Sequence, residues 1–268
     1  MATRRPFGAL PAALLLATAL VVLPTTGTVT ATVSAGATSL ATAAAPRGWT
    51  PVVPVNNAGA QTAVNGRCSD NAGTWLGMRW RGQLRWRLNS TTVPAYLGTP
   101  DAVVAAAQSA AATVDQGRND CGLGERLGTR QRYIGETGKR AGVNSVGGCG
   151  ERDGTNTVSF GDLAAGLLAV TCIWWYGGKQ GGRSVEADIL VDDAGGLFFL
   201  STPANCAGRW DLESTLTHEF GHAFGLGHVA YAEHGSLTMS DGLPDCSTAY
   251  RSLGLGDYQT LAAHYGYR

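Results

Sequence analysis

Charge and histidine are both scarce in this chain of 268 residues. Charged residues make up 15% of it, and the 20 basic side chains balance the 20 acidic ones. Without a net charge the protein has no broad field that would attract a nucleic acid or an acidic membrane surface, so we expect neither as a partner. Only five histidines occur, and none of them precedes His218. A site built from several histidines therefore has to lie in the C-terminal part of the chain.

The sequence also lacks an apolar run long enough to cross a membrane at its N-terminus. Residues 9–23 are apolar, but a run of about fifteen residues is short for a span that needs about 20. Arg4 and Arg5 precede the run and small residues follow it, which is typical of a cleaved signal peptide. We expect a signal peptide at residues 1–43, a secreted and extracellular protein, and no membrane partner after signal removal. The alternatives are a retained membrane anchor and, for the export route, a twin-arginine signal.

The rest of the chain divides into an arm and one domain. Residues 46–67 consist mainly of Pro, Ala, Asn, Gly and Thr and show no apolar periodicity. This composition is typical of a flexible segment. We therefore predict a flexible arm or short pro-segment at residues 44–66, followed by a single domain at residues 67–268. A domain of about 200 residues can bury one sizeable core.

One segment near the C-terminus carries most of the reactive side chains. It contains His218, Glu219, His222, Gly225 and His228. On a helix, side chains four residues apart share one face with roughly 5–6 Å between their Cβ atoms, so two imidazoles can reach one tetrahedral cation. A carboxylate beside such a pair can take a proton from a metal-bound water without being a ligand itself. The segment therefore predicts a metal site.

The third histidine can join the other two only if the helix ends before it. Gly225 tolerates the left-handed conformation that ends helices, and Gly227 offers a second flexible joint that turns His228 back. Three protein ligands leave a fourth position open for water, as in a catalytic zinc site. The alternative is an ordinary helix with two stray histidines, but chance gives this pattern on the order of 10⁻⁵ times per chain.

The same residues resemble the signature of the metzincins, H-E-x-x-H-x-x-G-x-x-H followed by a Met-turn. All five signature positions are filled, and Met239 has a suitable spacing for the methionine that lies beneath the metal. The resemblance implies an α+β fold, the zincin (metzincin) catalytic domain. Such a domain has a twisted mixed β-sheet with two long helices in an N-terminal subdomain, and a small C-terminal subdomain with the Met-turn and a terminal helix. Asp241 stands where some metzincins have a tyrosine ligand, which favours a matrixin-like site of three histidines.

The function implied by the resemblance is that of a secreted zinc-dependent endopeptidase. His218, His222 and His228 would hold one catalytic Zn²⁺, and Glu219 would be the general base. The substrate would be a protein or peptide bound in extended form, and we expect a monomer. His234 occupies no ligand position, so it is expected to be a solvated loop residue. Two alternatives are a secreted, non-enzymatic binding module stabilised by zinc and a zinc hydrolase of cell-wall peptides.

The resemblance also suggests secondary sites. Asp188, Asp192 and Asp193 would be oxygen ligands of a Ca²⁺ ion, with a solvated turn as the alternative. Residues 168–174 would be the edge strand of the cleft, to which an extended peptide adds as a further strand. Residues 242–244 would form part of the wall of a substrate pocket.

The six cysteines are even in number and include no Cys-x-x-Cys pair. In an exported chain this favours three disulfides over a cysteine metal site. Cys206 and Cys246 bracket the histidine segment and the Met-turn, and we predict that they pair. Arg67 and Cys68 faintly resemble the zinc-blocking motif of matrixin propeptides, but the flanking prolines and glycine are missing, so a disulfide is favoured. The sequence leaves open how the remaining four pair: Cys68, Cys121, Cys149 and Cys172.

Local patterns predict the surrounding elements. Apolar and polar residues alternate over residues 84–88, which indicates a half-buried strand. Thr99, Pro100 and Asp101 form a helix start, and a stripe of small apolar residues continues to Val114. Further elements are expected as strands at residues 157–160, 167–176 and 185–191, a helix capped by Asp211, a terminal helix at residues 256–265, and loops at residues 117–155.

Overall fold

The computed structural model describes residues 48–51, 55–58, 66–177 and 181–268. All of them belong to the unit that spans residues 43–268. The predicted signal peptide, residues 1–43, lies outside the described residues, as does most of the predicted arm. The described part of the chain is a mixed arrangement of helices and strands with a mostly parallel sheet, which agrees with the α+β class at that level.

Nine strands of the described residues form one sheet: β1 Gly48–Pro51, β2 Val55–Ala58, β4 Met78–Arg79, β5 Leu84–Leu88, β6 Gln131–Glu136, β7 Asn156–Gly161, β8 Leu167–Tyr176, β9 Gly182–Asp192 and β13 Gly242–Pro244. Their order is β13-β2-β8-β9-β7-β5-β6, with β1 also beside β8 and β4 beside β9. Strand β8 runs antiparallel to β9, whereas β7, β5 and β6 continue the sheet in parallel. Two small pairs lie outside this sheet: β10 Phe198–Phe199 with β11 Trp210–Asp211, and β12 Leu226–Gly227 with β3 Thr74–Trp75.

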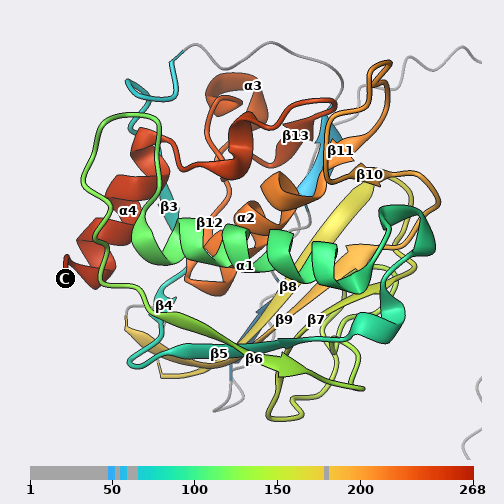
Figure 1. The fold of residues 1–268 in the computed structure, drawn as a ribbon. Helices are drawn as coiled ribbons and strands as arrows, with labels where there is room; N and C mark the ends of the chain where they lie inside the picture. The colour runs from blue at the N-terminus through green and yellow to red at the C-terminus, as the bar shows by residue number, and fades with distance from the viewer. Residues whose placement is uncertain (1–47, 52–54, 59–65, 178–180) are drawn as a thin grey trace, which may run out of the picture. The chain divides into compact units, whose positions relative to one another are not determined.

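The described helices are α1 Pro100–Gln116, α2 Leu212–Ala223, α3 Tyr231–His234 and α4 Leu255–Tyr265, with short 3₁₀ turns at Ser90–Thr92, Ala95–Leu97 and Ala249–Arg251. Helices α1 and α2 pack against each other on one face of the sheet (Figure 1). The Thr99 hydroxyl accepts a hydrogen bond from the Ala102 N–H, and the predicted apolar stripe of α1 is buried. A core between these helices and the sheet thus fixes the position of α2.

Several local predictions are confirmed. In β5 the apolar residues are buried and Arg85 is exposed, as the alternation predicts. Strand β8 has the predicted bounds. Residues 117–155 are not all loop, however, because β6 lies within them. This strand was missed because its residues are half-exposed and show no alternation between apolar and polar side chains.

The disulfides are Cys68–Cys121, Cys149–Cys172 and Cys206–Cys246. The predicted Cys206–Cys246 pair is confirmed, and Cys68 lies in a disulfide, as favoured. Three such pairs are compatible with an oxidising, extracellular environment. Among the described residues, no helix combines the length and the apolar character that crossing a membrane requires.

Strand β8 does not lie at an edge of the sheet, contrary to the prediction for residues 168–174. One side pairs with β9, and the other side pairs with β1 and β2. Both extra strands come from the predicted flexible arm, residues 44–66. The sequence did not indicate them because backbone pairing alone leaves no side-chain periodicity.

Candidate metal centre

Helix α2 carries the first part of the candidate site, and its start is well defined. Asp211 caps the helix as predicted, because its carboxylate accepts from the Ser214 N–H at 2.9 Å. Arg251 pairs with the same carboxylate at 2.5 Å. All residues of the helix except Glu213 are buried, so it is held on every side.

The end of α2 depends on Gly225. This residue has φ +98°, in the left-handed region, and its N–H donates to the carbonyl of His222 at 2.7 Å. A Cβ atom at this position would overlap the Met78 carbonyl and crowd the Trp75 ring. Only glycine fits both the conformation and the space, so the predicted role of Gly225 in ending the helix holds.

Gly227 has a different role from the predicted flexible joint. It lies in β12, which pairs antiparallel with β3, and it does not have a positive φ. A Cβ atom there would lie 2.7 Å from a methyl carbon of Thr74. Glycine is thus needed because two strands approach closely, and this pairing directs the chain into His228.

The three histidines converge on one point. The Nε2 atom of His218 lies 2.8 Å from that of His222 and 2.9 Å from that of His228, and the last two are 2.9 Å apart. They are the only group of three or more potential metal ligands in the described part of the chain. Nitrogens held about 2.0–2.1 Å from a tetrahedral ion are separated by about 3.3 Å, so small shifts accommodate an ion.

Hydrogen bonds on the far side of the rings determine which nitrogen is free. The Nδ1 atom of His218 lies 2.7 Å from the carbonyl oxygen of Thr238, and that of His222 lies 2.8 Å from the carbonyl oxygen of Leu226. A carbonyl can only accept, so each Nδ1 carries the proton and each Nε2 presents a lone pair. This is the tautomer that a metal ligand needs.

The protein keeps these rings neutral. Burial lowers the pKa values of His218 and His222 well below the ordinary value, and lowers the pKa of His228 to about 4. Neutral imidazoles are the form that binds a cation. His228 is only partly buried, whereas the other two are fully buried, so the site opens toward solvent beside His228.

Glu219 lies fully buried on the same helix. One oxygen, Oε2, accepts from the Thr171 hydroxyl of β8, and the other, Oε1, has no hydrogen-bond partner among the described residues. Burial raises the pKa of Glu219 to about 8, and the hydrogen bond from Thr171 opposes this rise. A cation in the site would favour the ionised carboxylate.

Met239 packs closely against α2. It is buried, and a Cβ atom on Gly221 would overlap its sulfur and crowd its methyl carbon. Gly221, between the two helical histidines, therefore allows this close approach. The sequence interpretation missed Gly221, although a glycine inside a helix is a signal of a close contact.

Thr238 connects the turn of residues 237–240, which contains Met239, to three other parts of the chain. Its carbonyl accepts from His218, its N–H donates to Asp257 of α4 at 2.8 Å, and its hydroxyl donates to the Ser252 carbonyl at 2.6 Å. Asp257 also accepts from the N–H groups of Gly254 and Met239, and burial raises its pKa to about 6. The terminal helix thus fixes the turn that orients a ligand.

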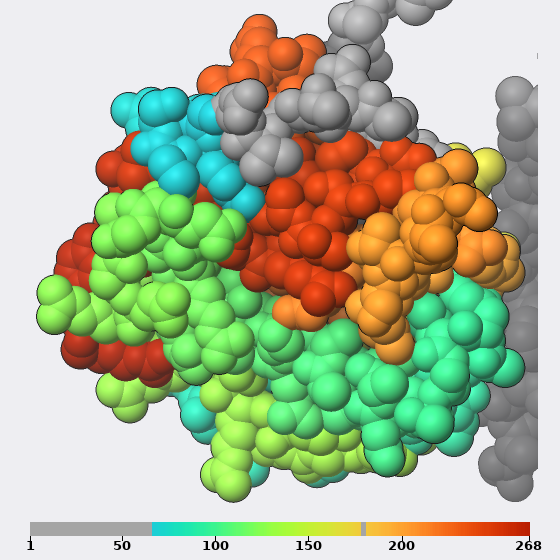
Figure 2. All heavy atoms as spheres, turned by 45° about the horizontal axis from the view of Figure 1, so that its top comes forward, coloured from blue at the N-terminus to red at the C-terminus, as the bar shows by residue number. Residues whose placement is uncertain are grey.

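Arg67 ties the start of the domain to the same region. It is buried, and its guanidinium donates to the carbonyls of Ala249 and Ser252 and lies over the ring of Tyr250. In Figure 2 the segment that begins at residue 66, in cyan, borders the red C-terminal residues. Cys68 follows directly and is bonded to Cys121, so this end of the domain is held covalently as well.

The predicted calcium ligands are not brought together into a metal-ligand group within the described residues. Both oxygens of Asp188 accept backbone N–H groups, from Gly142 at 2.6 Å and Thr157 at 2.8 Å, and burial raises its pKa to about 7. Asp192 is buried and accepts from the N–H groups of Ala194 and Leu163, whereas Asp193 is exposed. Asp188 therefore serves to hold loops, and of the three acids only Asp193 fits the alternative of a solvated turn.

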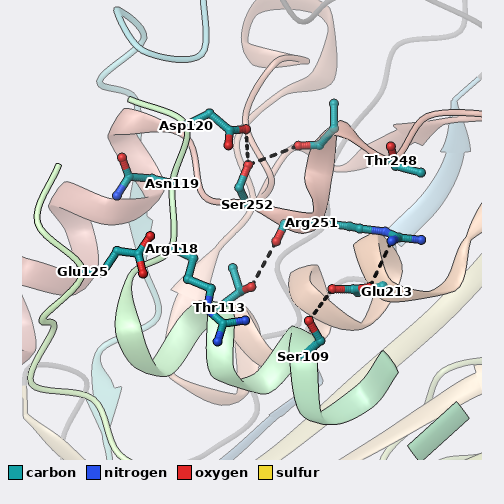
Figure 3. Close-up of a pocket in the computed structure, with 11 residues that line it drawn as sticks. Ser109, Thr113, Arg118, Asn119, Asp120, Glu125, Glu213, Thr248, Arg251 and Ser252 are labelled. Carbon is teal, nitrogen blue, oxygen red and sulfur yellow. Dashed lines mark hydrogen bonds and ion pairs between the residues drawn. The ribbon is translucent and has the colours of Figure 1, made fainter. Parts of the chain in front are cut away.

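A polar cavity of about 520 Å³ lies elsewhere, and the three histidines do not line it. Figure 3 shows Glu213 between Ser109 and Arg251, with hydrogen-bonding and ion-pair distances of 2.5 and 3.2 Å. Glu213 and Arg251 of this cavity pair with each other, and no group of potential metal ligands is found there among the described residues. His234 lies apart from the three clustered histidines, and its ring contacts Asp70 at 2.9 Å.

Neither a protein-family model nor a curated protein sequence matches this chain. Its function must therefore be inferred from the geometry of the site.

Proposed function

We propose that the protein is a secreted zinc-dependent endopeptidase with a metzincin-like, matrixin-type catalytic domain. The observation that carries the proposal is the convergence of three neutral imidazoles beside a buried carboxylate that has one free oxygen. The methionine packed beneath α2 supports the metzincin assignment. The three disulfides support secretion.

The donor set fits zinc. Three imidazole nitrogens suit a borderline-soft divalent ion, and the backbone carbonyls behind two rings are the outer contacts that zinc-binding histidines commonly make. When bound, zinc supplies a Lewis acid that lowers the pKa of a coordinated water toward about 7 and polarises the scissile carbonyl. His228, on the open side, leaves room for solvent and substrate to approach.

The residues of the chain divide the remaining tasks. His218, His222 and His228 hold the ion, and Thr238 and Leu226 orient two of them. Glu219 takes a proton from the attacking water at its free oxygen and delivers it to the leaving amine. The hydroxyl of Thr171 keeps the other oxygen of that carboxylate in place.

The test is Glu219→Gln in the purified, oxidised protein, with Glu233→Gln as a control because Glu233 is an exposed carboxylate outside the site. The Glu219 variant should retain zinc and lose at least about 100-fold in casein hydrolysis, since general-base catalysis contributes about 10²–10⁴-fold. The control should keep both properties. Full activity of Glu219→Gln, or a purified protein that holds no metal, would refute the proposal.

The same measurements separate an enzyme from a zinc-stabilised binding module. An enzyme loses hydrolysis when the metal is chelated and regains it when zinc is returned. A module would hold zinc and cut no peptide in a diverse library. Cleavage-site profiling of that library then separates protein substrates from cell-wall peptides.

A further inference from the structure

The outer face of the sheet, away from α1 and α2, carries arginines in pairs. In β5 the exposed Arg85 lies between Leu84 and Trp86, which are buried in the core. In β6 the side chain of Gln131 accepts from the Trp86 indole, so the neighbouring Arg132 points to the other face and is exposed. The parallel register places Arg85 directly opposite Arg132, with about 4.8 Å between the two backbones at the usual strand spacing.

A second pair lies where β4 joins β9. The parallel register places Arg79 opposite Arg183, and both side chains are exposed. Their neighbours Met78 and Gly182 are buried, and a Cβ atom on Gly182 would lie 3.1 Å from that of Met78. Because side chains alternate between faces, the two arginines share the outer face with the first pair. Strands β9 and β6 are three strand intervals apart in the sheet, which is about 15 Å.

No acidic side chain neutralises either pair within the part of the chain that the structure describes. All 20 acidic residues fall in that part, and none of its ion pairs includes Arg79, Arg85, Arg132 or Arg183. Like charges directly opposite each other on a sheet are destabilising, and this sheet contains the arrangement twice. A bound anion would relieve the repulsion.

A cavity of about 720 Å³ lies beside β4, next to the second pair. Its lining includes Trp75, Met78, Arg79, Arg81, Gly181 and His264. Arg79 donates to the carbonyl of His264 at 2.5 Å, and Arg81 is exposed. No acid lines this cavity, whereas three acids line the cavity shown in Figure 3. It therefore offers cationic groups to an anionic substituent of a ligand.

We propose that this surface, which we call the arginine face (Arg79, Arg81, Arg85, Arg132 and Arg183), binds an acidic polysaccharide that carries carboxylate or sulfate groups. A guanidinium matches the oxygens of a carboxylate or a tetrahedral oxyanion with two parallel hydrogen bonds. Arginines spread over about 15 Å of sheet suit a repeating chain of charges better than a single small ion. The choice of an extracellular polymer rests on the proposed secretion, whereas binding does not depend on catalysis.

The arginine face fits a polysaccharide better than two other polyanions. Single-stranded nucleic acids stack successive bases on aromatic side chains. Among the exposed large apolar side chains of the described residues, only Tyr176 is in register with an arginine of this face, Arg183. An anionic membrane is bound by apolar side chains together with cationic ones, so the same scarcity disfavours a membrane.

The test measures binding of the full chain to immobilised dextran sulfate and polygalacturonate, with neutral dextran as the blank. One variant carries Arg85→Gln and Arg132→Gln. The matched control carries Arg126→Gln and Arg209→Gln, which remove the same charge from exposed positions outside the strands. If the first variant does not fold, Arg132→Gln with Arg126→Gln provides the same comparison.

The native protein should bind at least one acidic polymer saturably in 150 mM salt and should not bind neutral dextran. The Arg85 and Arg132 variant should bind at least ten times more weakly. Its affinity should also depend less on salt, with the slope of log Kd against log salt reduced by about 1.4–1.8 because two ion contacts are lost. The control should stay within twofold of the native affinity.

Thermal unfolding gives a second readout, which a loss of charge alone would not produce. Without polymer, the Arg85 and Arg132 variant should melt at the native temperature or above, because one repulsive pair is gone. Excess polymer should raise the melting temperature of the native protein and of the control more than that of the variant.

Three results would overturn the proposal. They are no saturable binding to either acidic polymer, equal weakening in both double variants, and tighter binding to oligodeoxythymidine or to phosphatidylserine vesicles at the same concentration of negative charge. Failure here is distinct from failure of the proposed function. Hydrolysis of casein without polymer binding would leave the enzyme standing, and polymer binding without any hydrolysis would leave the arginine face standing.

Discussion

Two groups of buried ionisable side chains use their polar atoms in opposite ways. In the first, the carboxylate oxygens of Glu186 and Asp188 in β9 all accept hydrogen bonds. Those of Glu186 come from the Arg152 side chain and from the N–H groups of Asp153 and Gly154. In the second, which we call the histidine cluster (His218, His222, His228 and Glu219), three nitrogens face one another and one carboxylate oxygen has no partner in the described chain.

The difference shows which group is structural. Buried polar atoms are normally satisfied, so a group whose atoms are all bonded needs nothing more. The carboxylates of β9 hold the loop of residues 141–157 against the sheet, together with the Cys149–Cys172 disulfide. The histidine cluster keeps acceptor atoms that a cation and a solvent molecule would satisfy, so changes in the two groups should affect different properties.

The largest effect should come from removing a ligand. His228→Ala should lower zinc affinity by on the order of 10³-fold, because four ligands bind structural zinc with about 10–16 kcal/mol in total. Fold stability without metal should change little, since His228 is partly exposed. Zinc titration with a competing chelator measures the effect. His234→Ala is the control, and an equal loss of zinc in both variants would contradict the ligand assignment.

A backbone change at the end of α2 should have the next largest effect. Gly225→Ala forces a left-handed residue and a clash with Met78, which costs about 1–3 kcal/mol for the conformation alone. Both the zinc affinity and the melting temperature should fall, because the turn positions His228. Gly138→Ala is a suitable control, since a Cβ atom there meets no neighbour. An unchanged zinc affinity in Gly225→Ala would show that the turn does not set the ligand position.

The buried carboxylate of Asp188 should make the stability of the protein depend on pH. Burial raises the pKa of Asp188 to about 7, so the folded state keeps a proton that the unfolded state loses. This contribution to stability is fully present below the unfolded pKa of about 3.8 and is lost as the pH rises through 7. The slope is at most about 1.4 kcal/mol per pH unit.

Asp188→Asn should remove this slope and lower stability overall, since the amide nitrogen cannot accept the N–H groups that the carboxylate binds. Urea unfolding between pH 4.5 and 7.5, at constant zinc, measures both effects. Asp193→Asn, at an exposed position beside the same strand, should leave the profile unchanged. If the free energy of unfolding of Asp188→Asn depends on pH in the same way as that of the native protein, the raised pKa of Asp188 is contradicted.

The smallest effect should come from the hydroxyl that holds Glu219. Thr171→Val keeps the shape and removes the donor, so hydrolysis should fall about 5–10-fold, or about 1 kcal/mol. Zinc content should not change. Thr157→Val is the matched control, because that buried hydroxyl has no partner in the described chain. If both variants hydrolyse substrate equally well, Thr171 does not position the carboxylate.

Features that depend on neighbours in the sequence could be predicted. The helix caps Thr99 and Asp211 act on N–H groups three residues further on, and the histidines of α2 are one turn apart. The alternation in β5 reports directly on which side chains are buried. The Cys206–Cys246 pair could be predicted because it encloses the segment that carries the site.

Features that depend on distant backbone could not be predicted. The pairing of β12 with β3, which explains Gly227, joins residues about 150 positions apart through N–H and carbonyl groups that every residue has. The strands β1 and β2 likewise show no side-chain pattern. The sequence predicts Asp188 as a calcium ligand because it shows the acid but not the backbone N–H groups that donate to its carboxylate.

The hydrogen bonds of Thr238 imply that the terminal helix α4, the segment around Arg67 and the candidate metal centre unfold locally in one step. Loosening α4 frees the N–H of Thr238 from Asp257, and the same residue orients His218 and contacts Arg67. Amides of the terminal helix and of the Met-turn should therefore exchange with deuterium in a single cooperative step. Zinc should slow that step across the whole set, so that fraying of the C-terminus limits how long the ion is retained.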